Sequence, residues 1–217
     1  MHLGHEGAVR DLLAATRCER LHVVPAAQPP HRALPGASAA QRAAMLDLAF
    51  AADAAVRVDR RELERDGPSW TVDTLESLRA EYGPTCAIAF VLGTDALAGL
   101  ARWHRPDALL ELAHLIVLGR PGAPWPEDAG VAALLAGRRV GAVDALYDAP
   151  AGLVCEVHQR PVDVSATQVR AALAEPRAGR DPHAVDRLLS SAVSAYIRRH
   201  GLYGAVGPVP GATAERE

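Results

Sequence analysis

The chain has 217 residues, of which 49% are hydrophobic, so it is long enough to bury the core of one sizeable α/β domain. Its formal net charge of −3 argues against general nucleic-acid binding, and because all 23 basic residues are arginine, lysine-dependent chemistry is excluded. The three widely spaced cysteines show no CxxC pairing, and no stretch is typical of an export signal or a membrane span. We therefore expect a reduced, cytoplasmic protein that does not bind membranes.

Short apolar, β-branched runs alternate with helical patterns along the chain, which predicts βα units and a parallel sheet. Strands are predicted over Leu21–Pro25, Val56–Asp59, Ala87–Leu92, His114–Leu118 and Leu153–Val157. Helices are predicted over Gly4–Ala15, Ala39–Ala52, Thr71–Glu81, Pro106–Leu112 and Ala166–Ala174, with Ser38 and Ser165 as the N-caps of the second and the last.

The two ends of the chain depart from this alternation. The first predicted helix needs a preceding strand to complete a βα unit, and we expect that strand, near the middle of the sheet, to be missing from this chain. Glu127–Arg139 is interpreted as a peripheral insertion and Asp181–His200 as a terminal helical hairpin. Gly204–Glu217 has no periodicity and is predicted to be a disordered tail, which leaves one domain over residues 1–203.

A pair of histidines opens the first predicted helix, in the sequence His2-Leu3-Gly4-His5. Three-residue spacing places both rings on one face of the first turn, where free backbone N–H groups and the helix dipole already favour an anion such as a phosphate. Gly4 removes a side chain where a phosphate would approach the backbone. For this motif alone, two exposed histidines near a terminus are an equally good interpretation, whereas a metal pair is weaker because no further ligands lie nearby.

Polar and aromatic residues follow the predicted strands, where open α/β sheets bind ligands. His31 and Arg32 lie in a proline-rich loop and are potential phosphate donors, although an ordinary surface turn explains the loop as well. Asp95 suits a ribose hydroxyl or a metal-bound water, or else a helix cap. Trp103, next to His104, offers a flat face for a ring, or else belongs to the core.

Two hydroxyls and an arginine surround the last predicted helix start, in the order Ser165, Thr167 and Arg170. Such donors at the positive end of a helix dipole suit the outer phosphates of a nucleotide. An N-cap serine with a solvated arginine is the alternative. Because the histidine motif and this SxTxxR motif bracket one α/β domain, together they can hold one triphosphate between two helix N-termini.

Several longer segments carry a resemblance beyond these two motifs. They are Pro30–Arg32, Gln41–Leu46, Gly67–Leu75, Phe90–Asp95, Trp103, Ala113–Val117, Arg120–Gly122 and Gly201–Tyr203. From His2 to about Tyr203 the chain resembles the bacterial nicotinate-nucleotide adenylyltransferases of the HxGH nucleotidyltransferase superfamily. The resemblance implies a Rossmann-like (HUP/nucleotidylyl transferase) parallel sheet with helices on both faces. From the resemblance we also expect that the first strand of that sheet, and a Gly-Gly-Thr-Phe-Asp-Pro stretch after it, are missing from this chain.

The implied activity belongs to NAD biosynthesis. The enzyme would transfer the adenylyl group of ATP to nicotinate mononucleotide, giving nicotinate adenine dinucleotide and pyrophosphate. Mg²⁺ would enter with ATP, held mostly by phosphates and waters. The implied partners are ATP and nicotinate mononucleotide. Binding to nucleic acid or to a membrane is not expected, and a homo-oligomer is compatible with the sequence.

The resemblance also assigns roles to the candidate residues. The catalytic contacts to the ATP phosphates fall on His2 and His5, and the other ATP-binding residues are Gly4, Ser165, Thr167 and Arg170. The residues implied for the mononucleotide are His31, Arg32, Thr71, Asp95, Trp103 and His104. In this assignment Trp103 stacks on the pyridine ring, and the backbone around Thr71 and His104 recognises the nicotinate. His104 stands where the family often has tyrosine, which is tolerable if its backbone N–H is the binding group.

Two alternatives stay open. A different acceptor, nicotinamide mononucleotide or phosphopantetheine, would keep the enzyme class. An inactive, truncated nucleotide-binding domain is the other, because the missing segment would supply a central strand and a phosphate-binding loop.

Overall fold

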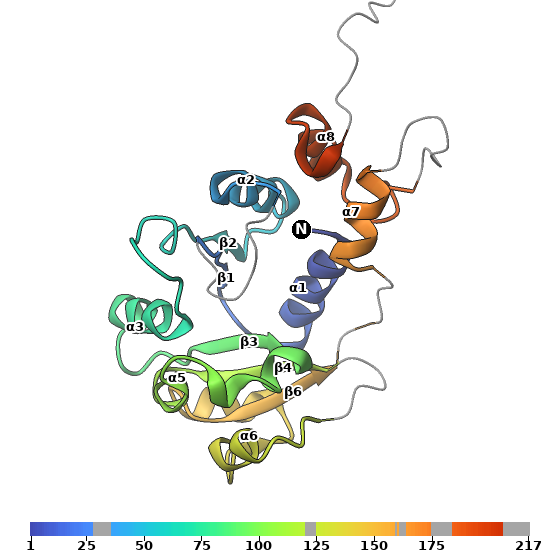
Figure 1. Cartoon of the computed structure of the whole chain (residues 1–217). Coiled ribbons are helices and arrows are strands. Elements are labelled where there is room, and N and C mark those ends of the chain that lie inside the picture. Colours follow the sequence, from blue (N-terminus) through green and yellow to red (C-terminus); the bar gives the residue numbers. More distant parts are fainter. Residues whose placement is uncertain (28–35, 120–124, 159, 161–163, 175–183, 206–217) are drawn as a thin grey trace, which may run out of the picture.

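The computed structural model describes residues 1–27, 36–119, 125–158, 160, 164–174 and 184–205 (Figure 1). The helices are α1 (Leu3–Ala15), α2 (Ala39–Ala49), α3 (Thr71–Tyr82), α4 (Thr94–Leu97), α5 (Pro106–Leu112), α6 (Ala129–Leu134), α7 (Ala166–Ala174) and α8 (Ser191–Arg199), and the 3₁₀ turns are η1 (Leu100–Arg102), η2 (Val143–Asp148) and η4 (Leu202–Gly204). The strands are β1 (Leu21–Val23), β2 (Val56–Val58), β3 (Ala89–Gly93), β4 (His114–Gly119), β5 (Arg139–Val140) and β6 (Val154–His158). All five predicted strands and all five predicted helices are present, with ends shifted by a few residues.

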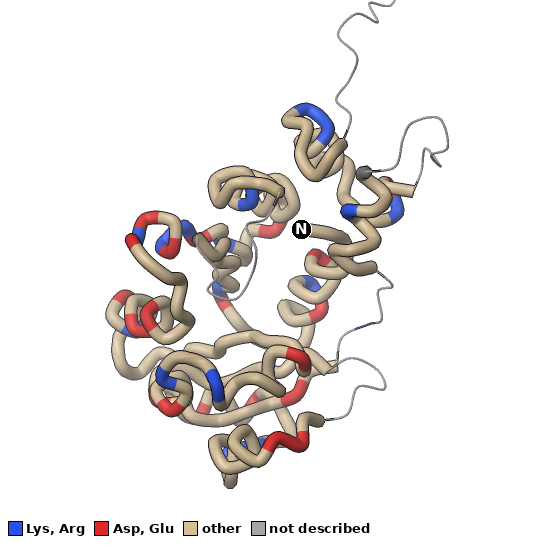
Figure 2. The backbone as a smooth tube through the Cα atoms, in the orientation of Figure 1, with Lys and Arg blue, Asp and Glu red and all other residues tan. Residues whose placement is uncertain are grey.

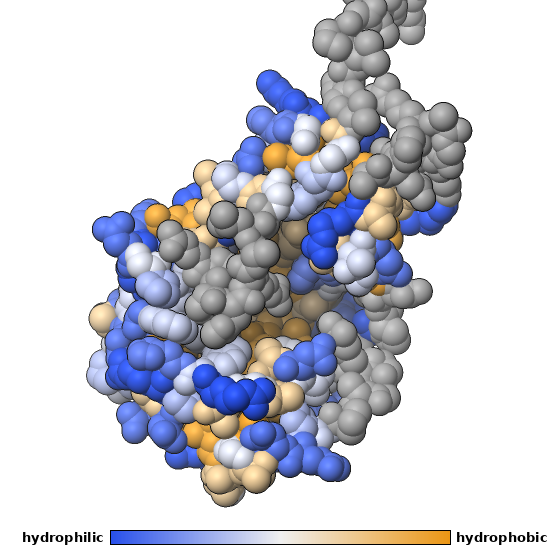
Figure 3. Space-filling model, viewed as in Figure 1, coloured by the Kyte–Doolittle hydropathy of each residue, from blue (hydrophilic) through white to orange (hydrophobic). Residues whose placement is uncertain are grey.

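The strands form two parallel sheets, as the alternation of strands and helices predicts. One sheet pairs β1 with β2, and the other has the order β3-β4-β6-β5. Among the strands that the structure describes, β1 and β3 are not hydrogen-bonded to each other, so each has one edge available for a further strand. On the side of the molecule drawn in Figure 3, the surface is hollowed between the larger sheet and α2, and hydrophobic residues form the floor of the hollow.

Helices cover both faces of the larger sheet. Side chains alternate across a strand, and on β4 the side chain of Ile116 packs in one cluster with Leu12 of α1. Its neighbours Leu115 and Val117 belong to another cluster, which contains Val131 of α6. Because β4 is buried on both faces, it reads as a continuous apolar run in the sequence.

A third apolar cluster lies away from the larger sheet and joins α1 and α7, which carry the histidine motif and the SxTxxR motif. It contains Met45 of α2, Leu173 of α7 and Val193 of α8, and Val9 of α1 packs against it. This cluster, rather than the larger sheet, therefore fixes how α1, α7 and α8 lie relative to one another.

Three predictions for the later part of the chain need comment. Glu127–Arg139 is not only peripheral, since it contains α6 and its last residue begins β5, which pairs with β6. In the predicted hairpin over Asp181–His200, the described residues form turns over 184–189 and then the single helix α8. The first two residues of the predicted tail are placed, with Gly204 ending η4 and Ala205 buried, and residues 206–217 lie outside the described part.

No helix within the described ranges combines the length and the apolar character that a membrane crossing requires. Figure 2 shows basic and acidic positions interspersed along the elements rather than gathered on one of them.

His114, the first residue of β4, is fully buried (0% exposed). The N–H of Leu153 donates to its Nδ1 (3.1 Å), so its Nε2–H donates to the carbonyl of Ala149 (2.8 Å). Burial lowers the pKa of His114, although the hydrogen bond to Ala149 opposes this effect. The ring is therefore neutral in the folded protein.

This burial predicts a pH-dependent stability. Below about pH 6.5, the ordinary pKa of histidine, the unfolded chain binds a proton at His114 that the folded chain does not, so the free energy of unfolding should fall. His114→Gln keeps one donor and one acceptor but does not titrate. We expect it to reduce the loss of stability between pH 7.5 and pH 5.5 by up to about 1 kcal/mol. Urea unfolding at the two pH values measures this, and an unchanged pH slope would contradict it.

Candidate active site

The first turn of α1 brings the two histidines together, as their spacing predicts. His2 is the N-cap, and its carbonyl accepts hydrogen bonds from the N–H groups of His5 (2.9 Å) and Glu6 (3.3 Å). The ring centroids of His2 and His5 lie 3.9 Å apart. His5 is exposed, whereas His2 is only 9% exposed, so His5 is the more accessible ring.

His2 is neutral at physiological pH. Burial, together with the smaller effects of the nearby His5 and the chain terminus, lowers its pKa to about 4. Its Nδ1 is buried and has no hydrogen-bond partner among the described residues. A buried nitrogen without a partner is costly, so this atom is available to hydrogen-bond a bound group.

Gly4 allows α1 to approach the segment that leads into α7. A Cβ atom at this position would lie 2.8 Å from Cγ1 of Val164 and 3.1 Å from Nδ1 of His2. The first of these distances is too short for a real contact, so with any larger residue the side chain of Val164, or the segment that carries it, would have to shift. Val164 directly precedes Ser165, and the fold therefore places the histidine motif beside the SxTxxR motif, although more than 150 residues separate them in the sequence.

Ser165 caps α7, as predicted. Its Oγ accepts a hydrogen bond from the N–H of Gln168 (3.2 Å), and the Gln168 side chain accepts one from the N–H of Ser165 (2.6 Å). Arg170 donates a long hydrogen bond to Oγ1 of Thr167 (3.4 Å). All three predicted side chains, Ser165, Thr167 and Arg170, are exposed at the beginning of α7 and are accessible to a ligand.

A second group of predicted residues lies where α3 begins. Thr71 is the first residue of α3, and the N-cap, Trp70, makes no side-chain hydrogen bond to the helix. The rings of Trp70 and His104 are stacked, with centroids 4.9 Å apart and planes 28° apart. Trp103 packs its ring edge-on against Phe90 (5.9 Å) and is partly buried. The structure thus brings His104 into ring contact with Trp70, the residue directly before Thr71.

The backbone next to this stack is strained. Arg105 has φ 52°, a left-handed conformation that non-glycine residues rarely adopt, and its guanidinium pairs with Glu76 of α3 at 2.9 Å.

Asp95, another predicted site residue, is exposed in the first turn of α4. Trp70 was not predicted as a site residue from the sequence. The signal that could have marked it as one is an aromatic residue directly before a helix start, where a capping side chain is usual.

His31 and Arg32 lie outside the described residues, as does Arg120–Gly122 of the resemblance. The residues that flank 28–35 are held by Arg42, which donates to the carbonyls of Ala26 and, at 3.0 Å, Ala37. The N–H of Ala27 donates to Oγ of Ser69 (3.1 Å), which ties this region to the residue before Trp70.

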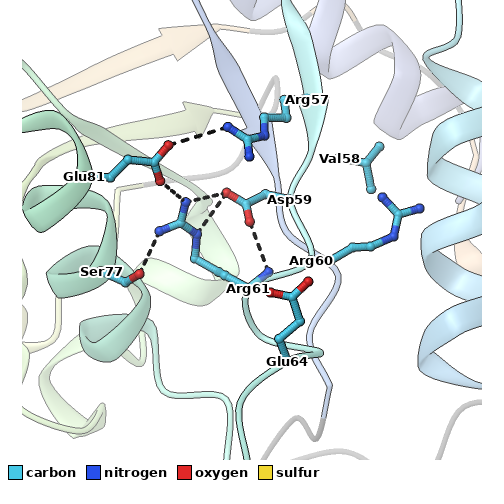
Figure 4. A pocket seen from close by; sticks show the side chains of 8 residues that line it. All are labelled: Arg57, Val58, Asp59, Arg60, Arg61, Glu64, Ser77 and Glu81. Atoms are coloured by element: carbon cyan, nitrogen blue, oxygen red, sulfur yellow. Dashed lines mark hydrogen bonds and ion pairs between the residues drawn. The ribbon is translucent and has the colours of Figure 1, made fainter.

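A separate pocket of about 420 Å³ lies beside β2 and α3 and is lined by Arg57, Val58, Asp59, Arg60, Arg61, Glu64, Ser77 and Glu81 (Figure 4). In this pocket Arg61 donates to Asp59 (2.7 Å) and to Glu81 (2.6 Å). The opposite charges neutralise each other, and no predicted site residue lines the pocket. Its network holds β2 against α3.

Asp59 also connects this network to β1. Its Oδ2 lies 2.7 Å from Nδ1 of His22, whose Nε2 lies 2.7 Å from the hydroxyl of Tyr82. Burial of Asp59 opposes ionisation, but the hydrogen bonds from Arg61 and His22 outweigh it and lower the pKa to about 2. Asp59 is therefore ionised at neutral pH and joins β1, β2 and α3.

Within the described ranges, no three His, Cys, Asp or Glu side chains gather into a metal site. The polar groups at the two motifs are imidazoles, hydroxyls and a guanidinium, which suit phosphate oxygens rather than Mg²⁺.

A family model described as cytidylyltransferase-like matches residues 1–172. The chain belongs to this cytidylyltransferase-like family. Its relatives include a protein of Marinobacter nauticus described as a probable nicotinate-nucleotide adenylyltransferase, which is 42% identical over 97% of this chain and 94% of its own length. A Pseudomonas aeruginosa protein with the same description is 43% identical over 94% of this chain and 92% of its own length. The resemblance inferred from the motifs is confirmed over nearly the whole chain.

Solved structures support the same fold. The Plasmodium falciparum nicotinic acid mononucleotide adenylyltransferase complexed with NaAD matches with a TM-score of 0.69 and 14% identity, over 94% of this chain and 92% of its own. The same enzyme complexed with APC matches with a TM-score of 0.67. The Rossmann-like nucleotidyltransferase fold expected from the sequence is thereby confirmed.

Proposed function

We propose that this member of the cytidylyltransferase-like family transfers the adenylyl group of ATP to nicotinate mononucleotide, releasing nicotinate adenine dinucleotide and pyrophosphate. The observation that carries the proposal is the contact between Gly4 and Val164, which sets the two histidines of α1 beside the hydroxyls and arginine of α7. This arrangement occurs in a chain more than 40% identical to relatives described as nicotinate-nucleotide adenylyltransferases.

The proposed reaction needs alignment and charge stabilisation rather than a general base. A phosphate nucleophile is already ionised at neutral pH, so the site has to align it with the α-phosphorus of ATP. His5 donates to the transferring phosphate, where negative charge grows. Ser165, Thr167 and Arg170 hold the outer phosphates as the pyrophosphate departs. If Mg²⁺ enters with ATP, it would add charge stabilisation to that supplied by these side chains.

The beginning of α3 supports nicotinate as the acceptor ring. Because Trp70 provides no side-chain cap, the first N–H groups of α3, beginning with Thr71, are not satisfied by their N-cap and favour a carboxylate. The stack of Trp70 on His104 ties the turn that carries His104 to the residue directly before α3. Nicotinate carries a carboxylate where nicotinamide carries a neutral amide.

The acceptor preference tests the proposal directly. With Mg²⁺ and ATP, we expect kcat/KM for nicotinate mononucleotide to exceed that for nicotinamide mononucleotide by at least about tenfold, or about 1.4 kcal/mol. Pyrophosphate release measures both rates. Equal rates with the two mononucleotides, or activity with phosphopantetheine alone, would sink the assignment.

Trp103→Ala tests how the ring is held. If Trp103 stacks on the pyridine, its loss should raise KM for the mononucleotide by a factor that corresponds to roughly 1–3 kcal/mol, with a much smaller change in kcat. Trp125→Ala is a matched control, because Trp125 packs under the guanidinium of Arg139 instead (3.8 Å). A Trp103→Ala protein with unchanged KM would leave this tryptophan as a core residue.

A further inference from the structure

Glu6 is a buried carboxylate in the first turn of α1, directly after His5. The residue is only 2% exposed. Its Oε1 accepts a hydrogen bond from Oγ of Ser190 (2.9 Å), and its Oε2 lies 3.7 Å from the guanidinium of Arg10. A buried carboxylate requires such partners, so its place in the fold depends on the Ser190 hydroxyl.

Ser190 is the N-cap residue of α8, yet its hydroxyl does not cap the helix. Serine is a preferred N-cap because its side chain usually accepts from an N–H of the first turn, but no such bond is made here. The hydroxyl donates to Glu6 instead, across 184 residues of sequence. The negative charge of Glu6 also lies at the positive end of the α8 dipole.

A backbone hydrogen bond reinforces this contact. The N–H of Leu3 donates to the carbonyl of Leu188 (3.0 Å), so both Leu3, the first residue of α1, and Glu6, the fourth, are tied to the segment that enters α8. The turn that is fixed in this way carries His2, Gly4 and His5.

We propose that Glu6 and Ser190 are a positioning pair, through which the C-terminal helix α8 sets the orientation of the first turn of α1 against α7. The inference rests on the proposed function, because it assigns the pair an effect on the use of ATP. Neither residue needs to touch ATP. A shift of about 1 Å in the groups that they hold is enough to cost about 10²-fold in rate.

Ser190→Ala is the first test. At a temperature well below its unfolding transition, we expect kcat/KM for ATP to fall about tenfold, while KM for nicotinate mononucleotide changes less than about twofold. Ser190→Thr keeps the hydroxyl and should restore most of the activity. Ser191→Ala removes the exposed neighbouring hydroxyl and should match the unmodified chain.

Amide hydrogen exchange over residues 3–6 provides a readout that needs no catalysis. Ser190→Ala and Glu6→Leu should speed this exchange, whereas Glu6→Gln, which keeps an acceptor, should change it less. Faster exchange together with unchanged kinetic constants for ATP would overturn the proposal, since the pair would then be merely structural. Unchanged exchange would overturn it as well.

Failure of the proposed function is distinguishable from failure of this inference. If the unmodified chain does not transfer an adenylyl group to nicotinate mononucleotide, the proposed function fails for this chain, as the alternative of an inactive nucleotide-binding domain would have it. The pair is then tested by binding of a non-hydrolysable ATP analogue. Binding weakened about tenfold in Ser190→Ala but not in Ser191→Ala supports the pair, and equal binding by both overturns it.

Discussion

His5→Ala should lower kcat by about 10²–10³ while leaving KM for nicotinate mononucleotide nearly unchanged, because removing a preorganised donor to a developing negative charge acts on the transition state. The structure supports His5 as this donor. It is exposed on the first turn of α1, whereas its neighbour His2 is buried and kept neutral by a pKa of about 4. Steady-state pyrophosphate release with ATP and nicotinate mononucleotide measures the change.

A second histidine provides the control for this substitution. His200 is the C-cap of α8, and its ring packs against Tyr196 with centroids 4.2 Å apart. His200→Ala should leave kcat within about twofold of the unmodified value, as substitutions away from a reacting centre do. A His5→Ala protein with nearly unchanged kcat would instead make His5 an ordinary surface residue of the first turn.

Gly4→Ala should reduce kcat/KM for ATP by about 10²-fold, since the added methyl group would have to displace either Val164 or the ring of His2. Displacing Val164 moves the start of α7 away from α1, and displacing His2 disturbs the histidine pair directly. Gly141→Ala is a matched control, because a Cβ atom there meets nothing within 4 Å. The same pyrophosphate assay, with ATP varied, measures the effect.

A double substitution separates two reasons for a glycine at this position. If the contact with Val164 is what requires glycine, Val164→Ala should recover part of the activity that Gly4→Ala loses, which appears as a non-additive double-mutant cycle. If the phosphate itself needs the space, as the sequence analysis suggests, the two losses should add.

Local sequence patterns determined much of the secondary structure of this protein. The spacing of His2 and His5, the N-caps Ser38 and Ser165, and the apolar runs of the strands all predict structure that is present. These features depend on contacts within a few residues, such as a capping box or the alternation of a strand, so the sequence carries them directly.

Contacts between distant segments could not be predicted in this way. Nothing in the sequence near Trp70 indicates its stack on His104, because the two residues meet only when α3 packs beside the turn that follows η1. The predicted helical hairpin before His200 has the single helix α8 within the described residues. Its role emerges only from the hydrogen bond between Ser190 and Glu6.

The sequence by itself therefore determined the class of fold, the histidine and SxTxxR motifs, and the resemblance that carries the proposed reaction. The tertiary structure decided that the motifs meet, through the approach of Gly4 to Val164, and that α8 is tied to the same turn. The physical reason is that a motif is specified by short-range spacing and capping. The distance between two motifs depends on the packing of the apolar cluster shared by α1, α2, α7 and α8, to which residues from both ends of the chain contribute.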